Sequence, residues 1–395
     1  MAPASQRKLR VALIGCGRQG KVHALNFAMS TPRCDVVAIV DPAPTTADWV
    51  RTNISPDLPV LRTPEDLYAR YPCPVGGKPS SGALDAVVIS TETAFHATLA
   101  CDAIGRGVHV LLEKPISIDA AGDEQVLAAS KARPDVRVVV ALSRRFDASY
   151  RAAFDRLQSG ELGEAFLVKS ATVDQYDESG WFVPYSLKSG GIFIDCGIHD
   201  IDIARWMLGL SDAQGVRQRS SARVKRCFAI GYNALHPELG RYGDADNATG
   251  VVQLTDGRSF TFNLGRTAIH GHECSCEIIG TKGRVFVNQN PAMNRVQILD
   301  GHGVRTESTP TYFERFEQAF VTEAREFVAG CLDGADMCVT LNDAVEAARI
   351  ATGLTYAVRS GEIVDFDQKT GKPIPPRGLV GSTAGTAIVD SQSKL

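Results

Sequence analysis

Apolar residues in the first part of the chain occur in short consecutive runs that are rich in branched side chains. These runs cover residues 9–14, 36–40, 86–90 and 108–112. Mainly apolar runs of this length are typical of strands buried on both faces, as in a parallel sheet covered by helices. The first run also opens onto a helical segment, so the pattern predicts alternating strands and helices.

After residue 146 the pattern changes to one helix followed by many short strands. The helix is predicted over residues 148–158, and the strands over residues 166–172, 223–230, 249–254, 259–263, 274–279 and 284–287. Glycine-containing turns separate the later strands at hairpin spacing, which favours a largely antiparallel sheet. Two amphipathic helices, over residues 312–329 and 342–359, close this part of the chain.

The first predicted strand leads directly into the sequence GCGRQG, a G-x-G-x-x-G motif. In such a turn Gly15 allows a sharp bend, Gly17 lets the backbone approach a pyrophosphate, and Gly20 allows close helix packing. The free N–H groups at the start of the helix, where Arg18 and Gln19 lie, attract phosphates. The motif is weak evidence by itself, but its place between a strand and a helix predicts a dinucleotide site.

The second predicted strand ends in Asp41, 21 residues after Gly20. A carboxylate at this position accepts hydrogen bonds from the ribose hydroxyls and repels a 2′-phosphate. The next residue, Pro42, offers no basic group to hold such a phosphate. The sequence therefore predicts NAD rather than NADP, with an ordinary turn residue as the alternative role for Asp41.

Polar residues also follow the next two predicted strands. Thr91 and His96 come after the strand at 86–90, and Glu113 and Lys114 after the strand at 108–112. Ligands of open parallel sheets bind beyond the carboxyl ends of the strands, so these residues are predicted to line the cofactor site. Lys114 would then project beside the nicotinamide, while a packing role for His96 is the alternative.

The segment SGGIFIDCGIHDIDIARW, residues 189–206, contains Asp195 and His199 four positions apart, where a glycine-rich loop becomes a helix. Side chains at this spacing on a helix have Cβ atoms about 5–6 Å apart, so both can serve one substrate hydroxyl. Histidine suits a general base because its ordinary pKa of about 6.5 lies near working pH. The alternatives are a surface pair, or a helix cap at Asp195 and a packed His199.

These patterns together predict an α/β protein of two domains and a tail. An N-terminal Rossmann dinucleotide-binding domain is expected over residues 1–145. An α+β domain with a large, mostly antiparallel open sheet is expected over residues 146–367, for substrate binding and oligomerisation. Residues 368–395 are rich in Lys, Pro, Gly, Ser and Thr and predict a flexible tail, and residues 69–82 a surface insertion.

With these motifs in this order, residues 8–366 resemble the Gfo/Idh/MocA oxidoreductases, the family of glucose-fructose oxidoreductase and inositol 2-dehydrogenase. The tripeptide Glu113-Lys114-Pro115 and the block GG-x-x-x-D-x-x-x-H are specific when they occur together. The sequence RRFDASY at 144–150 and the block at 190–206 look most like the inositol dehydrogenases and the fungal oxidoreductases associated with quinate utilisation.

The resemblance implies an NAD-dependent dehydrogenase that oxidises a secondary hydroxyl of a cyclic polyol, sugar or related ring to the ketone. Lys114 matches the lysine that touches cofactor and substrate, Asp195 the carboxylate that binds a substrate hydroxyl, and His199 the general base. A base and a cation at one oxygen suit this reaction, because the hydroxyl proton must leave as the carbonyl forms. A non-catalytic NAD-binding sensor or repressor of the same fold and an NAD-assisted glycosidase remain the alternatives.

The resemblance also implies further substrate ligands and an oligomer. Arg144 matches an arginine near the substrate. Inositol dehydrogenases present a histidine and an asparagine to the polyol where this chain has Thr172 and Asp174. We expect Thr172 and Asp174 to contact the substrate, which leaves the identity of the ring open. Family members commonly pair through the open sheet face, so a homodimer or homotetramer is expected.

Composition and charge limit the classes of partner that we expect for this chain. The chain has 395 residues, 44% of them apolar, and a formal net charge of −3, with Lys and Arg scattered along it. This distribution lacks the basic face that nucleic-acid backbones require, and no apolar run approaches the roughly 20 residues of a membrane span. The ten cysteines are dispersed, and Cys274 and Cys276 have no second ligand pair at zinc spacing, so no metal is expected.

The chain ends in Ser393, Lys394 and Leu395. S-K-L at a free C-terminus is a peroxisomal address that an import receptor reads. We therefore expect a peroxisomal location, and a cytoplasmic one in a cell without peroxisomes.

Deleting Ser393, Lys394 and Leu395 should release an N-terminally fluorescent fusion from peroxisomes into the cytosol, because the receptor reads the free tripeptide. Fluorescence microscopy in peroxisome-containing cells measures this change. Catalytic activity should be the same in both forms, and an unchanged location would refute the address.

Overall fold

The computed structural model describes residues 7–74 and 82–379, which fold into two compact units. Unit 1 consists of Met1–Phe146 with Gln318–Val345, and unit 2 of Asp147–Glu317 with Glu346–Leu395. Three site residues predicted for targeting, Ser393, Lys394 and Leu395, lie outside the described residues. So do residues 75–81 of the expected insertion and residues 380–392 of the expected tail.

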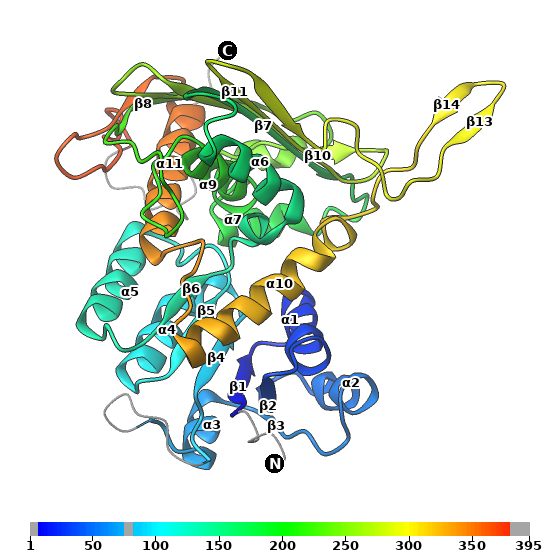
Figure 1. Ribbon diagram of the computed structural model, residues 1–395, viewed down its shortest axis with the longest axis vertical. Helices are drawn as coiled ribbons and strands as arrows, with labels where there is room; N and C mark the ends of the chain where they lie inside the picture. Colours follow the sequence, from blue (N-terminus) through cyan, green and yellow to red (C-terminus); the bar gives the residue numbers. More distant parts are fainter. Residues whose placement is uncertain (1–6, 75–81, 380–395) are drawn as a thin grey trace. The chain divides into compact units, whose positions relative to one another are not determined.

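Unit 1 is built on a six-stranded parallel sheet (Figure 1). The strand order is β3-β2-β1-β4-β5-β6, with the bounds β1 (Leu9–Ile14), β2 (Cys34–Val40), β3 (Val60–Leu61), β4 (Ala86–Ile89), β5 (His109–Leu112) and β6 (Val138–Val140). Its helices are α1 (Arg18–Met29), α2 (Thr45–Asn53), α3 (Pro64–Arg70), α4 (His96–Gly105) and α5 (Ala120–Ala132), with short 3-10 turns η1 (Thr93–Phe95) and η2 (Ser143–Phe146). This order confirms the predicted Rossmann domain.

The strand order reverses at β1, which has β2 on one side and β4 on the other. In open parallel sheets such a switch point is where ligands bind, beyond the carboxyl ends of the strands. The loops that follow β1 and β4 begin at Gly15 and Ser90, and Ser90 N–H donates to the carbonyl of Ile14 at 2.8 Å. The predicted cofactor residues of the glycine turn, and Thr91 and His96, therefore follow the two neighbouring strands at this switch point, whereas Asp41 follows β2 and Glu113 and Lys114 follow β5.

Unit 2 is built on a seven-stranded sheet in the order β12-β11-β7-β10-β9-β8-β15. Its strands are β7 (Ala165–Gln175), β8 (Val224–Tyr232), β9 (Asn247–Leu254), β10 (Ser259–Ala268), β11 (Glu273–Gly280), β12 (Arg284–Val287) and β15 (Val364–Asp365). Neighbouring strands pair antiparallel except β7 and β10, which are parallel. The mostly antiparallel sheet that the sequence predicts is therefore confirmed, with one parallel pairing that it did not reveal.

Helices cover one face of this sheet. They are α6 (Ala148–Gln158), α7 (Phe182–Ser189), α8 (Ile192–Asp195) and α9 (Ile198–Met207), with the 3-10 turn η3 (Pro237–Tyr242). Along β7 the residues Val168, Ser170 and Thr172 are buried on the helix side, whereas Lys169 between them is exposed. This alternation is that of a sheet with one packed and one open face.

Each of two long helices contains a boundary between the units along the chain. They are α10 (Tyr312–Asp333), which has a non-helical residue at Phe316, and α11 (Leu341–Ser360). In unit 1, α10 packs on α1 through an edge contact of Phe27 with Phe327 at 6.3 Å between ring centroids. The expectation that residues 146–367 form one domain differs from the structure, in which Gln318–Val345 belongs to unit 1.

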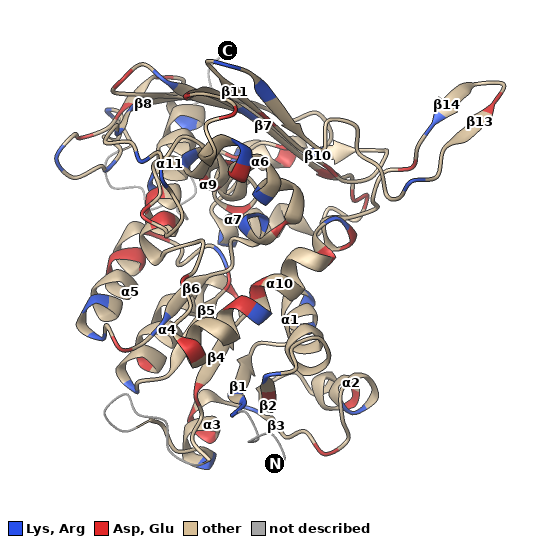
Figure 2. Ribbon diagram, in the orientation of Figure 1, with Lys and Arg blue, Asp and Glu red and all other residues tan. Residues whose placement is uncertain are grey.

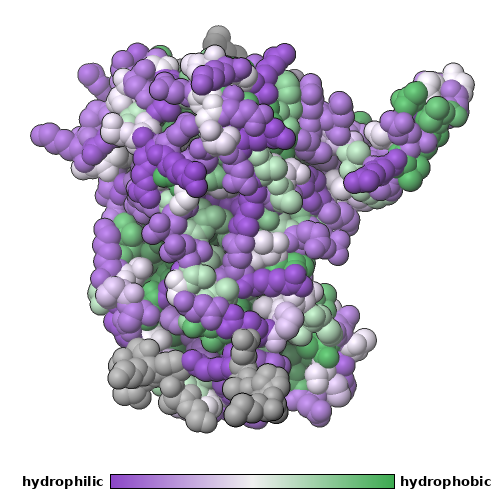
Figure 3. All heavy atoms as spheres, viewed as in Figure 1, coloured by the Kyte–Doolittle hydropathy of each residue, from purple (hydrophilic) through white to green (hydrophobic). Residues whose placement is uncertain are grey.

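Unit 2 also contains a two-stranded hairpin that the sequence analysis did not predict, β13 (Ile298–Asp300) with β14 (Gly303–Arg305). It extends away from the sheet of its unit (Figure 1), and apolar residues gather on it in the space-filling view (Figure 3). Leu299 and Val304 are 72% and 65% exposed. Isolated two-stranded hairpins have marginal stability in water, so this ribbon gains from a surface that covers it.

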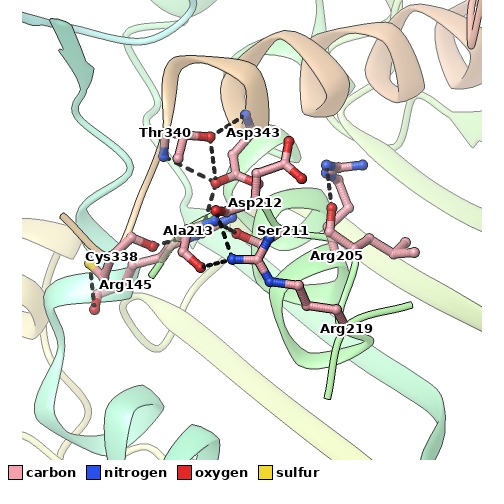
Figure 4. Close-up of polar contacts among 10 residues, drawn as sticks. Arg145, Arg205, Ser211, Asp212, Ala213, Arg219, Cys338, Thr340 and Asp343 are labelled. Atoms are coloured by element: carbon pink, nitrogen blue, oxygen red, sulfur yellow. Dashed lines mark hydrogen bonds and ion pairs between the residues drawn. The ribbon is translucent and has the colours of Figure 1, made fainter. Parts of the chain in front are cut away.

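A buried ion pair joins the end of the Rossmann chain to the returning segment of unit 1 (Figure 4). The Arg145 guanidinium donates to Asp343 at 3.1 Å and to the carbonyl of Cys338 at 2.8 Å, and both ionic side chains are fully buried. The amide and hydroxyl of Thr340 donate to the same carboxylate oxygen. Removing one partner of such a pair costs about 3–5 kcal/mol, so Arg145 is a structural residue.

Charges are otherwise mixed along the described chain, with Lys and Arg interspersed among Asp and Glu (Figure 2). Across residues 7–74 and 82–379, no helix combines the length and apolar character of a membrane span. Over the same residues, no group of three or more His, Cys, Asp or Glu side chains is arranged to hold a metal ion.

Candidate active site

The glycines of the first turn have distinct structural roles. Gly15 has a positive φ of 95°, and a Cβ there would overlap the carbonyl of Ser90. A Cβ on Gly20 would overlap the carbonyl of Gly15. In the part of unit 1 that the structure describes, no atom beyond its chain neighbours lies within 4 Å of a Cβ position on Gly17. The turn is therefore tight at two glycines and open at the third, where a pyrophosphate fits.

The N-terminus of α1 suits an anion. Gly17 is its N-cap and provides no side chain to cap the first N–H groups, and the first turn has the sequence RQGK, without an acidic residue. Arg18 is exposed and Gln19 half-buried. The exposed N–H groups and the positive end of the helix dipole together favour phosphate at this turn.

Asp41 ties the end of β2 to the glycine turn. Its Oδ2 accepts the N–H of Cys16 at 2.7 Å, and its Oδ1 accepts from the N–H of Ala43 at 2.8 Å and the hydroxyl of Thr46 at 3.0 Å. A carboxylate has about four acceptor sites, so it can also bind a ribose hydroxyl. Burial and the charge of Asp41 raise the pKa of the Cys16 thiol to about 11, so this cysteine stays protonated.

His96 packs between two backbone segments. Its Nδ1 lies 2.8 Å from the carbonyl oxygen of Pro115, its Nε2 lies 3.1 Å from that of Thr91, and burial lowers its pKa. Thr91 is half-buried, and its hydroxyl donates to the carbonyl of Glu92. The structure thus matches the packing alternative for His96, because both ring nitrogens are directed at the loops after β4 and β5.

Glu113 supports the backbone of Lys114. Its Oε1 lies 2.7 Å from Nε2 of His23 on α1, and its Oε2 accepts the N–H of Lys114 at 3.1 Å. Burial by itself raises the pKa of Glu113, but the hydrogen bond from His23 and the charges of His23 and Lys114 lower it below its usual range. The predicted cofactor residue Glu113 is therefore a buried carboxylate that orients the lysine, and sequence reasoning missed its partner His23.

Glu323 on α10 is a second buried acid of unit 1. The residue is fully buried, and within residues 7–74 and 82–379 neither carboxylate oxygen has a hydrogen-bond partner. Burial, and then the charge of Glu113, raise the pKa of Glu323 well above its usual range. Glu323 therefore carries a proton in the folded protein, since an unpaired buried carboxylate is costly.

In unit 2, Asp195 and His199 lie on two successive helices. Asp195 ends α8 and His199 lies in the first turn of α9, so the single helix expected for this pair is broken between them. Gly197 lies at the break, and a Cβ there would overlap Leu264 and the backbone of Phe193, so this position requires glycine. Asp195 and His199 are half-buried while the residues between them are buried, so both are accessible from the surface of their segment.

Asp244 positions the start of α8. Its Oδ1 accepts the N–H of Ile192 at 2.9 Å, and a Cβ on Gly191 would lie 2.9 Å from the same oxygen. Gly191 also has a positive φ of 89°. The glycine pair of the motif therefore gives both the left-handed turn and the space for Asp244, which sequence reasoning did not single out.

The two substrate ligands predicted on β7 differ in their surroundings. Thr172 is 2% exposed and donates to Oδ2 of Asp200 at 2.8 Å, and Ser170 donates to the other oxygen of Asp200. Thr172 thus supports α9, which carries His199. Asp174 is more accessible, with a side chain that is 32% exposed.

Asp195 and Asp174 share one cation, Arg266 of β10. Arg266 donates to Oδ2 of Asp195 at 2.9 Å and lies 3.7 Å from Oδ2 of Asp174. On the far side of Asp174, Nδ1 of His272 lies 3.3 Å from Oδ1. Sequence reasoning missed Arg266 and His272, since one arginine within a strand and one histidine before a strand carry no motif.

The predicted substrate residue Arg144 belongs to unit 1, where it is buried in η2.

Two family descriptions match this chain. "Oxidoreductase family, NAD-binding Rossmann fold" matches residues 9–142, and "GFO/IDH/MocA C-terminal domain" matches residues 150–286. The chain is also 30% identical over 366 residues to scyllo-inositol 2-dehydrogenase (NAD(+)) of Bacillus subtilis, a match that covers 92% of this chain and 98% of that protein. The chain belongs to the Gfo/Idh/MocA family.

Further members of the Gfo/Idh/MocA family match over similar lengths. Inositol 2-dehydrogenase of Rhizobium meliloti is 30% identical over 355 residues, which are 89% of this chain and 96% of that protein. The crystal structure of scyllo-inositol dehydrogenase from Lactobacillus casei with bound NAD(H) and scyllo-inositol is 28% identical, with a TM-score of 0.81, and the match covers 91% of this chain and 99% of that one. The family, the fold class and the NAD-binding domain predicted from sequence are thus confirmed.

The buried acid Glu323 predicts a pH-dependent stability. A group whose pKa is raised by folding stabilises the protein below its unfolded pKa, and this contribution is lost as the pH rises through the folded pKa. Above about pH 4.5, the ordinary value for this group, wild-type stability should therefore fall relative to Glu323→Gln. The slope of this difference is at most about 1.4 kcal/mol per pH unit.

Calorimetric unfolding midpoints of wild type and Glu323→Gln between mildly acidic and alkaline pH measure this difference. Glu317→Gln is the matched control, because Glu317 is exposed on the same helix. Midpoints that move in parallel in wild type and Glu323→Gln would contradict a buried, protonated Glu323.

Proposed function

We propose that this chain is an NAD-dependent dehydrogenase that oxidises a secondary hydroxyl of a cyclic polyol to the ketone. The observation that carries the proposal is the accessible carboxylate and imidazole of Asp195 and His199, in a chain whose glycine turn fits a dinucleotide. The named activities of its relatives, scyllo-inositol and inositol 2-dehydrogenases, support a ring polyol as the substrate class.

Each proposed group has one task. When bound, NAD supplies the acceptor for the hydride that leaves the carbon. His199 takes the hydroxyl proton, since a neutral imidazole is a base near working pH. Lys114, whose backbone is held by Glu113, provides a cation that stabilises negative charge on the oxygen as the carbonyl forms. Asp195 accepts a hydrogen bond from a ring hydroxyl and orients the polyol.

The decisive experiment follows NADH absorbance with purified protein, NAD and a panel of inositols, aldoses, sugar acids and quinate or shikimate. NADH formation with a ring polyol is the expected result and names the substrate. If no compound of the panel gives NADH although calorimetry detects NAD binding, the result would contradict the proposal and favour a non-catalytic NAD-binding sensor or an NAD-assisted glycosidase.

Substitution of the proposed acid–base groups tests the mechanism. Lys114→Met and His199→Ala should each lower kcat by about 10²–10⁴, the usual contribution of a positioned proton-transfer group, while the NAD Kd changes little. Lys131→Met is the control, because Lys131 is an exposed lysine on α5 and does not lie on the open sheet face. Near-normal turnover in both site variants would contradict the assigned roles.

A homo-oligomer is the proposed assembly, and the import receptor read through Ser393, Lys394 and Leu395 is a further proposed partner. The open face of the unit 2 sheet supports the assembly because it exposes Ile230, Val251 and Phe286. Apolar side chains gathered on one exposed face favour association.

Light scattering should therefore give the mass of a dimer or tetramer for the wild type and a lower mass for Val251→Glu, because a charge on an apolar interface opposes association. Met29→Glu is the control, since it adds the same charge at an exposed apolar position of unit 1. A monomeric wild type would contradict the proposed assembly.

A further inference from the structure

Four side chains of unit 2 form a row in which charges alternate, and we call it the Asp195–His272 row. It runs from Asp195 on α8 to Arg266 on β10, then to Asp174 on β7 and His272 just before β11. The successive distances are 2.9 Å, 3.7 Å and 3.3 Å. Residues that are distant in sequence are therefore joined through one guanidinium.

The cations of this row are more deeply buried than its carboxylates. The side chains of Arg266 and His272 are 9% and 2% exposed, whereas those of Asp195 and Asp174 are 14% and 32% exposed. The guanidinium also lies over the ring of Phe182, with its Cζ 5.2 Å from the ring centroid. The cations thus form an inner support, and the acceptor groups are the more accessible part.

The electrostatics keep the row ionised. Burial by itself raises the pKa of Asp174, but His272 and Arg266 lower it below its usual range. Burial lowers the pKa of His272, but the hydrogen bond with Asp174 and further contacts raise it to about 9. For Arg266, the charges of Asp195 and other neighbours more than offset burial, so its pKa is raised. Asp174 is therefore an ionised acceptor at neutral pH.

Other titratable groups face the row and do not replace this pairing. Asp244 is electrostatically coupled to Arg266, but its Oδ1 accepts the N–H of Ile192, and burial raises the pKa of this acid. Cys196 also contributes to the raised pKa of Arg266, and Cys274 to that of His272. The ion-pair distances assign the Arg266 cation to Asp195 and Asp174.

We propose that Arg266 is a positioning residue that holds Asp195 and Asp174 as two fixed, acceptor-only groups, which bind two different hydroxyls of one substrate ring. This inference rests on the proposed dehydrogenase function and extends it to substrate selection. A carboxylate has about four acceptor sites, so Asp195 can accept from Arg266 and from a hydroxyl together. Asp174 faces the guanidinium as an ion pair at 3.7 Å and can accept from a second hydroxyl. The planar guanidinium fixes the two acceptors more strictly than a flexible ammonium would.

Substrate choice follows from this arrangement. Two ionised acceptors repel a carboxylate or phosphate at the same ring positions, and Arg266 already faces two carboxylates and so provides no clamp for an anion. Neutral ring polyols are therefore preferred over ring acids. Because the two acceptors are fixed relative to each other, they also discriminate between epimers that differ in the direction of one hydroxyl.

The test compares wild type, Arg266→Met and Arg266→Lys with scyllo-inositol, myo-inositol and quinate. Arg266→Met should raise the KM of the preferred inositol by about 10–100-fold, the loss expected for a charge-assisted hydrogen bond, with the KM of NAD unchanged. The acid limb of inositol binding, measured by calorimetry as the pH dependence of the inositol Kd on the NADH-bound enzyme, should move up by about one pH unit or more, because the carboxylates lose a cation. Arg266→Lys should restore the acid limb but not the epimer preference.

Arg156→Met is the matched control, because Arg156 lies on α6 of the same unit with a side chain that is 57% exposed. It should leave KM, the acid limb and the epimer ratio as in wild type. The proposal is overturned if a folded Arg266→Met keeps the wild-type values of all three.

Asp174→Asn decides the question if Arg266→Met does not fold. This near-isosteric change removes one charged acceptor and should alter the scyllo-to-myo ratio of kcat/KM by about tenfold or more, with the KM of NAD unchanged. An unchanged ratio overturns the proposal.

The outcomes also separate this inference from the function on which it rests. A wild type that oxidises quinate in preference to both inositols keeps the dehydrogenase and overturns the selection argued here. A wild type that forms no NADH with any ring alcohol overturns both.

Discussion

A charged side chain inside a protein needs a partner of opposite charge, and in this chain that requirement joins segments far apart in sequence. Arg145 and Asp343 pair across 198 positions within unit 1, and Arg266 reaches Asp195 across 71 positions within unit 2. Where the described structure offers no partner, as at Glu323, the acid keeps its proton instead. The elements that carry the chemistry are placed by these pairs as much as by apolar packing.

The same need for paired charges explains the residues that lie directly behind the proposed catalytic groups. Glu113 uses His23 to stay ionised and accepts the backbone N–H of Lys114. Arg266 has the corresponding role for Asp195, and Asp244 holds the start of the short helix that ends there. A reacting group must keep its orientation to within a fraction of an ångström, and a supporting layer of ion pairs provides that rigidity.

Local patterns predicted the elements well and their long-range contacts poorly. The buried runs at 9–14 and 86–90 are strands of the parallel sheet. The sequence predicted them because a strand that is covered on both faces is apolar along most of its length. The hairpin β13–β14 was missed because its short strands are largely exposed, and a strand without a buried face has no alternating apolar pattern in the sequence. The helix break between Asp195 and His199 was also missed, and the need for glycine at position 197 depends on Leu264, a residue on another element.

The sequence by itself determined the family, the two sheets and the dinucleotide turn, because motif spacing and periodicity are properties of neighbouring residues. Tertiary structure decided that Gln318–Val345 belongs to unit 1, that His96 and Thr172 are bonded internally, and that Arg266 joins Asp195 to Asp174. The physical reason is that an ion pair depends on where the folded chain brings two side chains, and sequence spacing contains no such distance.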